Sequence, residues 1–122
     1  REIDPVFLIA PTSSSGRIRK ICDASRGYVY YVSLKGITGA AHLDLDSVAE
    51  KMAEIREIST LPVGVGFGIK DAQTASAMGR MADAVIVGSA IVSRIAEHQG
   101  DTGATIDAVS GFVSELRAGL DS

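Results

Sequence analysis

The sequence predicts an α/β protein built on a parallel sheet of four strands. Apolar runs typical of buried strands lie at 6–10, 28–33, 63–65 and 84–87, and they alternate with segments whose apolar residues recur every three or four positions. Strands and helices that alternate at these lengths are typical of right-handed βαβ units with parallel strands. We therefore expect four βα units in a single region, 1–122, with one additional short helix before the last helix.

Composition narrows the class of protein. The 122 residues suffice for one domain at most, and 46% hydrophobic and 22% charged residues are ordinary for a soluble globular protein. A net charge of −3 without a basic cluster argues against nucleic-acid binding, and no apolar run is long enough to span a bilayer. The single cysteine cannot form an internal disulfide, which favours a reducing compartment and a cytoplasmic protein. The sequence starts at Arg1 and not at methionine, so we expect a longer parent chain.

The first unit opens with Val6–Ala10, which is expected to be a fully buried strand because its apolar residues do not alternate with polar ones. Ile18, Ile21 and Cys22 then recur at helical spacing, and Gly27 is expected to end that helix. Cys22 lies on the apolar stripe, where a free cysteine is usually a small core residue and not a nucleophile.

The second strand, Tyr28–Ser33, carries bulky side chains on both faces and predicts a sheet covered on each side. The loop 34–42 that follows contains two glycines and is a candidate lid. Its single histidine, His42, is expected to be solvated surface and not a general base.

Asp44 or Asp46 can cap the next helix, whose predicted apolar stripe comprises Val48, Met52, Ile55 and Ile58. Its charged residues are expected to form a solvated face and to take no part in acid–base chemistry; they are Glu50, Lys51, Glu54, Arg56 and Glu57.

The remaining helices also carry start signals. Asp71 can cap a helix rich in small residues, and Ser89 can cap the short helix that follows the fourth strand. Thr102 or Thr105 is expected to start the final helix. Its predicted buried stripe comprises Ile106, Val109, Phe112, Val113, Leu116 and Leu120.

Two consecutive strands end in glycine. Gly66 and Gly68 follow the third strand and Gly88 follows the fourth, so backbone amides can approach a ligand there without an intervening Cβ. The pattern is not a dinucleotide-binding fingerprint, because its third glycine would fall on Ile69. Bare amides beside a helix N-terminus favour a phosphate, as in barrels that bind phosphate after their last two strands.

Four motifs in this order resemble the tryptophan synthase alpha chain. They are the run 26–33 (RGYVYYVS), Gly36-Ile-Thr-Gly39, Gly66-Phe-Gly-Ile69 and Gly88-Ser-Ala-Ile-Val92. The resemblance covers essentially the whole chain, with the motifs at family spacing. It implies a (β/α)8 barrel, of which this chain would be the C-terminal half, strands five to eight.

The resemblance also implies a function in tryptophan biosynthesis. That family is a lyase that cleaves indole-3-glycerol phosphate to indole and glyceraldehyde-3-phosphate, and it passes indole to a beta subunit that carries pyridoxal phosphate. The alpha chain itself would use no cofactor and no metal.

Site residues carried over from the family fall into three groups. Thr38 matches a loop residue that orients a catalytic acid. Tyr30 and Phe67 match walls of the indole pocket. The positions that match or adjoin the phosphate site are Gly39, Gly66, Phe67, Gly68, Gly88 and Ser89.

The family's catalytic glutamate and aspartate lie in the other half of the barrel, so this chain is expected to show no turnover alone. A half-barrel exposes two strand edges and an apolar face, which predicts self-association or pairing with the N-terminal half.

Two alternative functions remain open. One is another phosphate-binding barrel, such as a sugar-phosphate isomerase or epimerase, which leaves the Gly-Ile-Thr-Gly loop unexplained. The other is a non-catalytic phosphate-binding or assembly half-barrel that works only with a partner chain.

Overall fold

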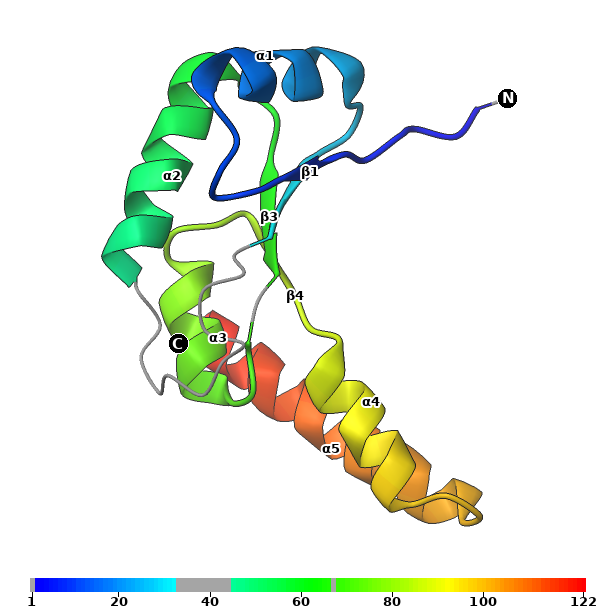
Figure 1. The fold of residues 1–122 in the computed structure, drawn as a ribbon. Helices are drawn as coiled ribbons and strands as arrows, with labels where there is room; N and C mark the ends of the chain where they lie inside the picture. The colour runs from blue at the N-terminus through cyan, green and yellow to red at the C-terminus, as the bar shows by residue number, and fades with distance from the viewer. Residues whose placement is uncertain (1, 33–44, 67) are drawn as a thin grey trace.

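The computed structural model describes residues 2–32, 45–66 and 68–122, and within these ranges it contains four strands and five helices (Figure 1). The predictions for His42, Asp44, Thr38, Gly39 and Phe67 lie outside the described residues. In chain order the elements are β1 (Leu8–Ile9), α1 (Ser15–Ala24), β2 (Val29–Val32), α2 (Leu45–Ile58), β3 (Val63–Gly66), α3 (Ala72–Gly79), β4 (Ala84–Ile86), α4 (Ser89–Glu97) and α5 (Thr102–Asp121).

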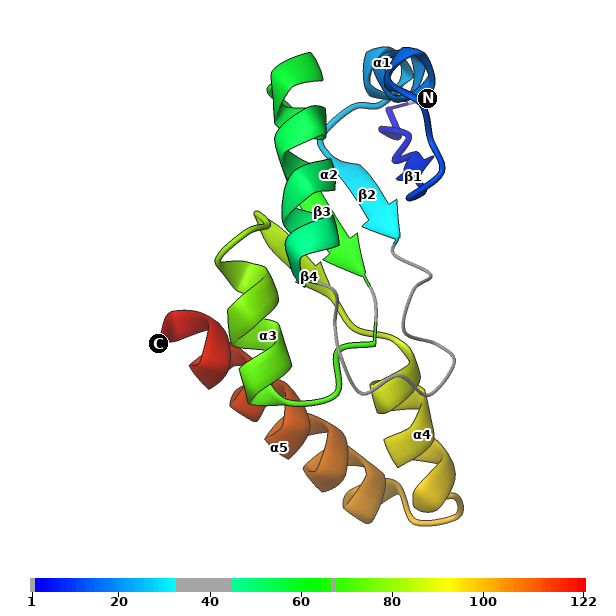
Figure 2. The ribbon, with the colours of Figure 1, turned by 60° about the vertical axis from the view of Figure 1, so that its left-hand side comes forward.

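The strands form one sheet in the order β1-β2-β3-β4, and every neighbouring pair is parallel. Each strand thus pairs with the next strand along the chain, and a helix connects the two. Helices α2 and α3 lie along the same side of the sheet (Figures 1 and 2). The predicted series of four βα units is confirmed, as is the additional short helix, α4, before the last helix.

The core lies between the sheet and these helices. Alternate strand residues point into it, because successive side chains of a strand face opposite sides. The buried apolar side chains of the strands are those of Ile9, Val29, Tyr31, Val63 and Val65. They meet the apolar stripes of the helices, whose buried members include Ile18, Cys22, Val48, Met52, Ile55, Ala75 and Met78. The predicted core position of Cys22 and the stripe of α2 are confirmed.

The other face of the sheet is largely open. Leu8 is 60% exposed, Tyr28 is 38% exposed, and Tyr30 and Val32 are half-buried. The predictions of a fully buried first strand and of a sheet covered on both sides are therefore wrong. The cause is the position of β1 at one end of the strand order, and no helix of the described residues covers this face. An open face between two free edges is what half of a closed barrel would present.

Capping explains where α1 and α3 begin. Ser14 caps α1 by accepting a hydrogen bond from the amide of Arg17, and Asp71 caps α3 as predicted. Helix α1 ends at Ala24, before the predicted end at Gly27, because Ser25 adopts an extended conformation with ψ of 151° and its hydroxyl donates to the carbonyl of Ile21 at 2.8 Å. Gly27 instead supplies a left-handed turn, with φ of +83°, that leads into β2.

The last two helices begin differently from the prediction. Gly88 is the N-cap of α4 and makes no side-chain bond, while Ser89 is the first helical residue. Asp101 caps α5 through the amide of Ala104, in place of Thr102 or Thr105.

The apolar stripe of α5 is only partly buried. Phe112 and Leu116 are buried, whereas Ile106 is 58% exposed and Val113 is 46% exposed. Helix α5 packs on α3 and α4. Its apolar residues recur at helical spacing beyond the part of its surface that these two helices cover.

Candidate functional site

The two glycine turns lie side by side at the carboxyl edge of the sheet. In the ladder between β3 and β4, Gly66 pairs with Ile86. Gly68 and Gly88 each stand two residues beyond that pair, on parallel strands. Because the strands run in the same direction and in register, both turns leave the sheet at the same level. This edge is where ligands bind in parallel α/β proteins.

Both turns are exposed and have open space beside them. Gly68 has φ of +47°, a left-handed conformation that L side chains rarely adopt. Among the described residues, and apart from the chain neighbours of each glycine, no heavy atom lies within 4 Å of the place where a Cβ would stand at Gly68 or at Gly88. A ligand can therefore approach the backbone at either turn.

Helix α4 directs its N-terminus to this edge. The amides of Ile91 and Val92 both donate to the carbonyl of Gly88, at 2.9 and 3.0 Å. The amides of Ser89 and Ala90 precede the first bond that the helix can make. These two N–H groups, at the positive end of the helix dipole, suit an anion.

Tyr30 lies on the open face of the sheet and reaches toward the same edge. It pairs with Gly64 in the ladder, yet its ring lies over Gly66, which is two residues nearer to the carboxyl edge on the same strand. A Cβ at Gly66 would collide with the Tyr30 hydroxyl and would lie 2.6 Å from Cζ. Gly66 therefore makes room for the ring, a role that the sequence did not reveal. Tyr30 supplies an aromatic surface beside the glycine turns.

The segment after Gly68 is anchored at both of its ends. The side chain of Ile69 is 4% exposed and belongs to the core. Asp71 accepts hydrogen bonds from the hydroxyl and the amide of Thr74, at 2.5 and 2.7 Å. The bond from the Thr74 hydroxyl, and then that from its amide, lowers the pKa of the Asp71 carboxyl below its usual value.

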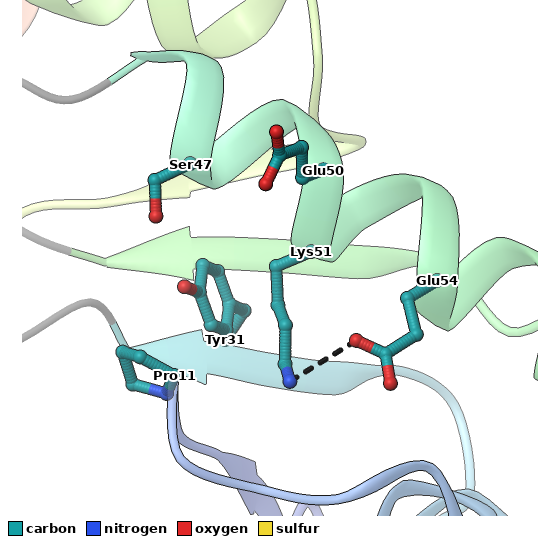
Figure 3. A pocket seen from close by; sticks show the side chains of 6 residues that line it. All are labelled: Pro11, Tyr31, Ser47, Glu50, Lys51 and Glu54. Carbon is teal, nitrogen blue, oxygen red and sulfur yellow. Dashed lines mark ion pairs between the residues drawn. The ribbon is translucent and has the colours of Figure 1, made fainter.

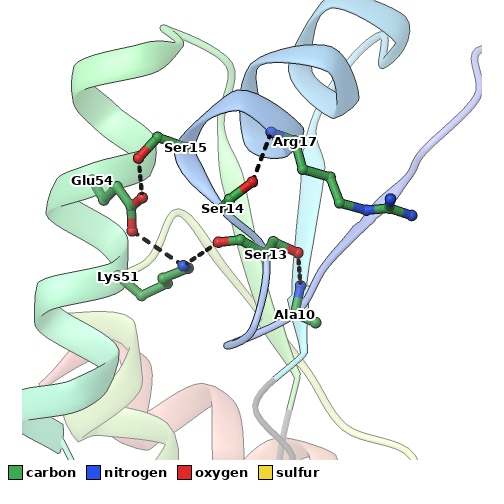
Figure 4. Close-up of polar contacts among 7 residues, drawn as sticks. All are labelled: Ala10, Ser13, Ser14, Ser15, Arg17, Lys51 and Glu54. Atoms are coloured by element: carbon green, nitrogen blue, oxygen red, sulfur yellow. Dashed lines mark hydrogen bonds and ion pairs between the residues drawn. The ribbon is translucent and has the colours of Figure 1, made fainter.

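Lys51 and Glu54 of α2 are not the free surface charges that we predicted. The Lys51 ammonium donates to the carbonyl of Ser13 at 2.7 Å and pairs with Glu54 at 3.1 Å, and Glu54 also accepts from the Ser15 hydroxyl at 2.7 Å (Figure 4). The bond from Ser15, followed by the contact with Lys51, lowers the pKa of Glu54. These contacts, here called the α2 clamp, hold the turn between β1 and α1 against α2. The solvated-face prediction is wrong for Lys51, whose side chain is only 13% exposed because that turn folds over the helix, whereas Glu54 stays 32% exposed.

A hollow of about 270 Å³ adjoins the α2 clamp, between α2 and the ends of β1 and β2 (Figure 3). Its lining residues are Pro11, Tyr31, Ser47, Glu50, Lys51 and Glu54. It lies on the helix-covered side of the sheet, since Tyr31 points into the core side, whereas Tyr30 lies on the open side. The hollow is thus separate from the glycine turns.

Arg56, also predicted to be solvated, tethers the opposite edge of the sheet. Its guanidinium donates to the carbonyl of Met81 at 3.0 Å and to the Asp83 carboxylate at 3.4 Å. Asp83 in turn accepts from the amide of Val63 at 2.9 Å. The network ties together the starts of β3 and β4, and its role is structural.

In 2–32, 45–66 and 68–122, no three His, Cys, Asp or Glu side chains are grouped so that they could hold a metal ion. Within those same residues, no helix has the length and apolar character needed to cross a membrane.

The structure thus brings five predicted site residues to one edge of the sheet: Tyr30, Gly66, Gly68, Gly88 and Ser89. Thr38, Gly39 and Phe67 lie outside the described residues. The fold and this edge define the chain as half of a (β/α)8 barrel protein with glycine turns after its last two strands.

The comparison with family models is consistent with this class and identifies the family. The family "Tryptophan synthase alpha chain" matches residues 1–121. The chain therefore belongs to the tryptophan synthase alpha chain family, as the motifs predicted, and the match does not favour an isomerase or epimerase.

Curated relatives agree in sequence. The tryptophan synthase alpha chain of Thioalkalivibrio sulfidiphilus is 59% identical over 119 residues, which cover 98% of this chain and 45% of the relative. That of Marinobacter nauticus is 54% identical over 122 residues, which cover 100% of this chain and 45% of the relative. This chain thus spans about half the length of the curated relatives that it matches.

Solved structures agree in fold. Tryptophan synthase subunit alpha from Legionella pneumophila matches with a TM-score of 0.82 and 32% identity, over 98% of this chain and 43% of that one. Tryptophan synthase from Mycobacterium tuberculosis in its aminoacrylate-bound form matches with a TM-score of 0.78 and 31% identity, over 97% of this chain and 40% of that one. The expected half-barrel is confirmed.

Proposed function

We propose that this chain is the phosphate-binding half of an alpha-subunit lyase of tryptophan biosynthesis. In this proposal the complete barrel cleaves indole-3-glycerol phosphate to indole and glyceraldehyde-3-phosphate. The observation that carries the proposal is the register of β3 and β4, which sets Gly68 and Gly88 side by side at the carboxyl edge in a member of this family.

The phosphate is held mainly by backbone amides. Those of Ser89 and Ala90 are available at the start of α4, and the open space at Gly68 and Gly88 allows close approach. Gly39, Gly66 and the backbone of Phe67 complete the proposed anion site.

The indole ring lies against aromatic side chains in this proposal. Tyr30 stands beside Gly66 on the open face of the sheet, so the ligand extends from the glycine turns along that face. Phe67 contributes a second wall, and Thr38 orients a catalytic acid.

Cleavage needs proton transfer that this half does not supply. One group must protonate C3 of the indole and another must remove a proton from the glycerol hydroxyl, and positioned carboxyl groups perform such steps. We assign those carboxyl groups to the part of the barrel that precedes this chain in the relatives. The chain needs no cofactor of its own in this scheme, and pyridoxal phosphate belongs to the beta subunit that receives the indole. We place the assembly in the cytoplasm.

The test is complementation. The 122-residue chain is assayed for indole release from indole-3-glycerol phosphate, alone and after co-expression with the preceding part of the Thioalkalivibrio relative. We expect no turnover from the chain alone and measurable turnover from the pair. Turnover by the purified chain alone, or none from a pair that co-purifies as a folded complex, would refute the proposal.

The open face allows one competing assembly. Self-association through the edges of β1 and β4 would occupy the surface that the other half needs. Light scattering over a range of concentrations distinguishes self-association from pairing with the other half of the barrel. Addition of the other half should convert any dimer of this chain into the mixed pair.

A further inference from the structure

The last turn of α5 packs directly on the backbone of α3. A Cβ at Gly119 would collide with the carbonyl oxygen of Ala72, and it would lie 3.0 Å from the carbonyl carbon and 3.1 Å from Cα of that residue. Figures 1 and 2 show the C-terminal end of α5, in red, beside α3. The absence of a side chain at Gly119 is therefore what allows the two helices to meet at this distance.

Ala72 is the first residue of α3 and comes four positions after Gly68. Ile69, between them, is fixed in the core, and Asp71 is fixed by its bonds to Thr74. The segment between Gly68 and Ala72 is therefore short and restrained. Since Asp71 is bonded to Thr74 and moves with α3, a displacement of Ala72 strains the packing of Ile69 and the conformation of its neighbour Gly68.

The close approach at the other end of α3 involves a flexible side chain. A Cβ at Gly79, at the other end of α3, would lie 2.5 Å from Cδ2 of Leu120. That atom is the tip of a flexible side chain, which can rotate away. At the end of α3 that follows the glycine turn, by contrast, the atoms that Gly119 approaches belong to the backbone and cannot rotate away.

From this geometry we infer that Gly119 is a positioning residue for the glycine turn at Gly68. The inference rests on the proposed function, because it concerns how that anion site is held in place. A methyl group at residue 119 needs about 1 Å more separation from Ala72 than the helices provide. A misplacement of about 1 Å is enough to change binding or rate by one to two orders of magnitude.

The experiment compares three forms of the 122-residue chain: the unaltered chain, Gly119→Ala and Gly111→Ala. Gly111 is the matched control, since it lies on the same helix and a Cβ there would meet no described residue within 4 Å outside the neighbouring backbone of α5. The amide resonances of Gly68 and Ile69 are recorded first without ligand and then during a titration with inorganic phosphate. In Gly119→Ala we expect both resonances to move and the Kd for phosphate to rise about tenfold. Gly111→Ala should change neither.

A merely structural role gives a different result. If Gly119→Ala lowers the urea midpoint but leaves the resonances and the Kd unchanged, the inference is wrong. If the unaltered chain binds no phosphate, the proposed anion site fails, but the ligand-free resonances still decide whether Gly119 positions the turn. If Gly119→Ala does not fold, a variant that ends at Ala118 removes the contact without adding atoms. Unmoved resonances of Gly68 and Ile69 in that variant would also overturn the inference.

Discussion

The packing of Tyr30 over Gly66 leads to a quantitative prediction about Gly66→Ala. The new methyl group would collide with the Tyr30 hydroxyl and would lie 2.6 Å from Cζ and 2.9 Å from Cε1. Aromatic ring atoms do not tolerate carbon at these distances. Either the ring swings off the strand or β3 moves away from it.

The two responses have similar costs. Exposing roughly 50 Å² of the ring costs about 1 kcal/mol. Keeping the ring in place and straining the strand costs about 1–3 kcal/mol, as overpacked sites do. We therefore expect Gly66→Ala to lower the free energy of unfolding by about 1–3 kcal/mol.

Urea unfolding followed by circular dichroism measures this loss, and a double-mutant cycle with Tyr30→Leu locates its cause. Without the ring, the cost of Gly66→Ala should fall by about 1 kcal/mol or more. Gly64→Ala is the matched control on the same face of β3. Its methyl group would lie 3.0 Å from the mobile tip of Ile86 and 3.5 Å from the Tyr28 ring, so we expect a loss below about 1 kcal/mol.

The reasoning is refuted if Gly66→Ala costs the same with and without the Tyr30 ring. It is also refuted if Gly64→Ala proves as damaging as Gly66→Ala. Either result would mean that the ring does not determine the need for glycine at residue 66.

Three further predictions follow from the described contacts, each measured by urea unfolding. Lys51→Met should cost about 1–3 kcal/mol, because the carbonyl of Ser13 loses its donor, whereas Lys20→Met, at an exposed position of α1, should cost less than about 0.5 kcal/mol. Gly68→Ala should cost about 1–2 kcal/mol, because φ of +47° is left-handed, and should weaken phosphate binding. Asp71→Asn keeps a comparable N-cap but removes the charge. Because the pKa of Asp71 is lowered in the folded chain, its extra stability over the Asn variant should be present above about pH 4 and should disappear as the pH falls through that lowered pKa.

Each of these outcomes can fail in a specific way. Equal losses for the Lys51 and Lys20 variants would show that the α2 clamp adds nothing to stability. An unaltered stability of Gly68→Ala would show that the turn does not need its left-handed residue. A difference between Asp71 and its Asn variant that persists unchanged at pH 2 would exclude the charge as its cause.

The sequence predicted the order of the elements well, because that information is local. Val48, Met52 and Ile55 recur at helical spacing and are all buried in the structure. Asp71 caps α3 because its side chain needs only the residues that immediately follow it.

Predictions failed where contacts between residues far apart in the sequence determine whether a side chain is buried. The consecutive residues Leu8 and Ile9 are both apolar, so the sequence does not distinguish them. In the structure only Ile9 faces the helices, and β1 lies at an edge of the sheet. Lys51 reads as surface because its acceptor, the carbonyl of Ser13, lies 38 residues away. No local pattern carries such pairings.

The candidate site shows the same division. The sequence predicts turns with accessible backbone amides at Gly68 and Gly88. The register of the strands places both turns at one edge of the sheet. Glycine at 66 has two separate explanations that the sequence could not distinguish, the approach of a ligand and the room needed by Tyr30. The α3–α5 contact at Gly119 was not anticipated, since nothing in the sequence near Ala72 points to it.

The agreement between strand order and chain order has a consequence for assembly. Because each strand pairs with its successor, the sheet can grow one βα unit at a time, much as solenoid repeats add to one another. A ring of eight such strands divided between two polypeptides is interrupted at only two ladders, those on the outer sides of β1 and β4. Joining the pieces therefore requires two new ladders and the closure of one apolar face, with no rethreading of either polypeptide.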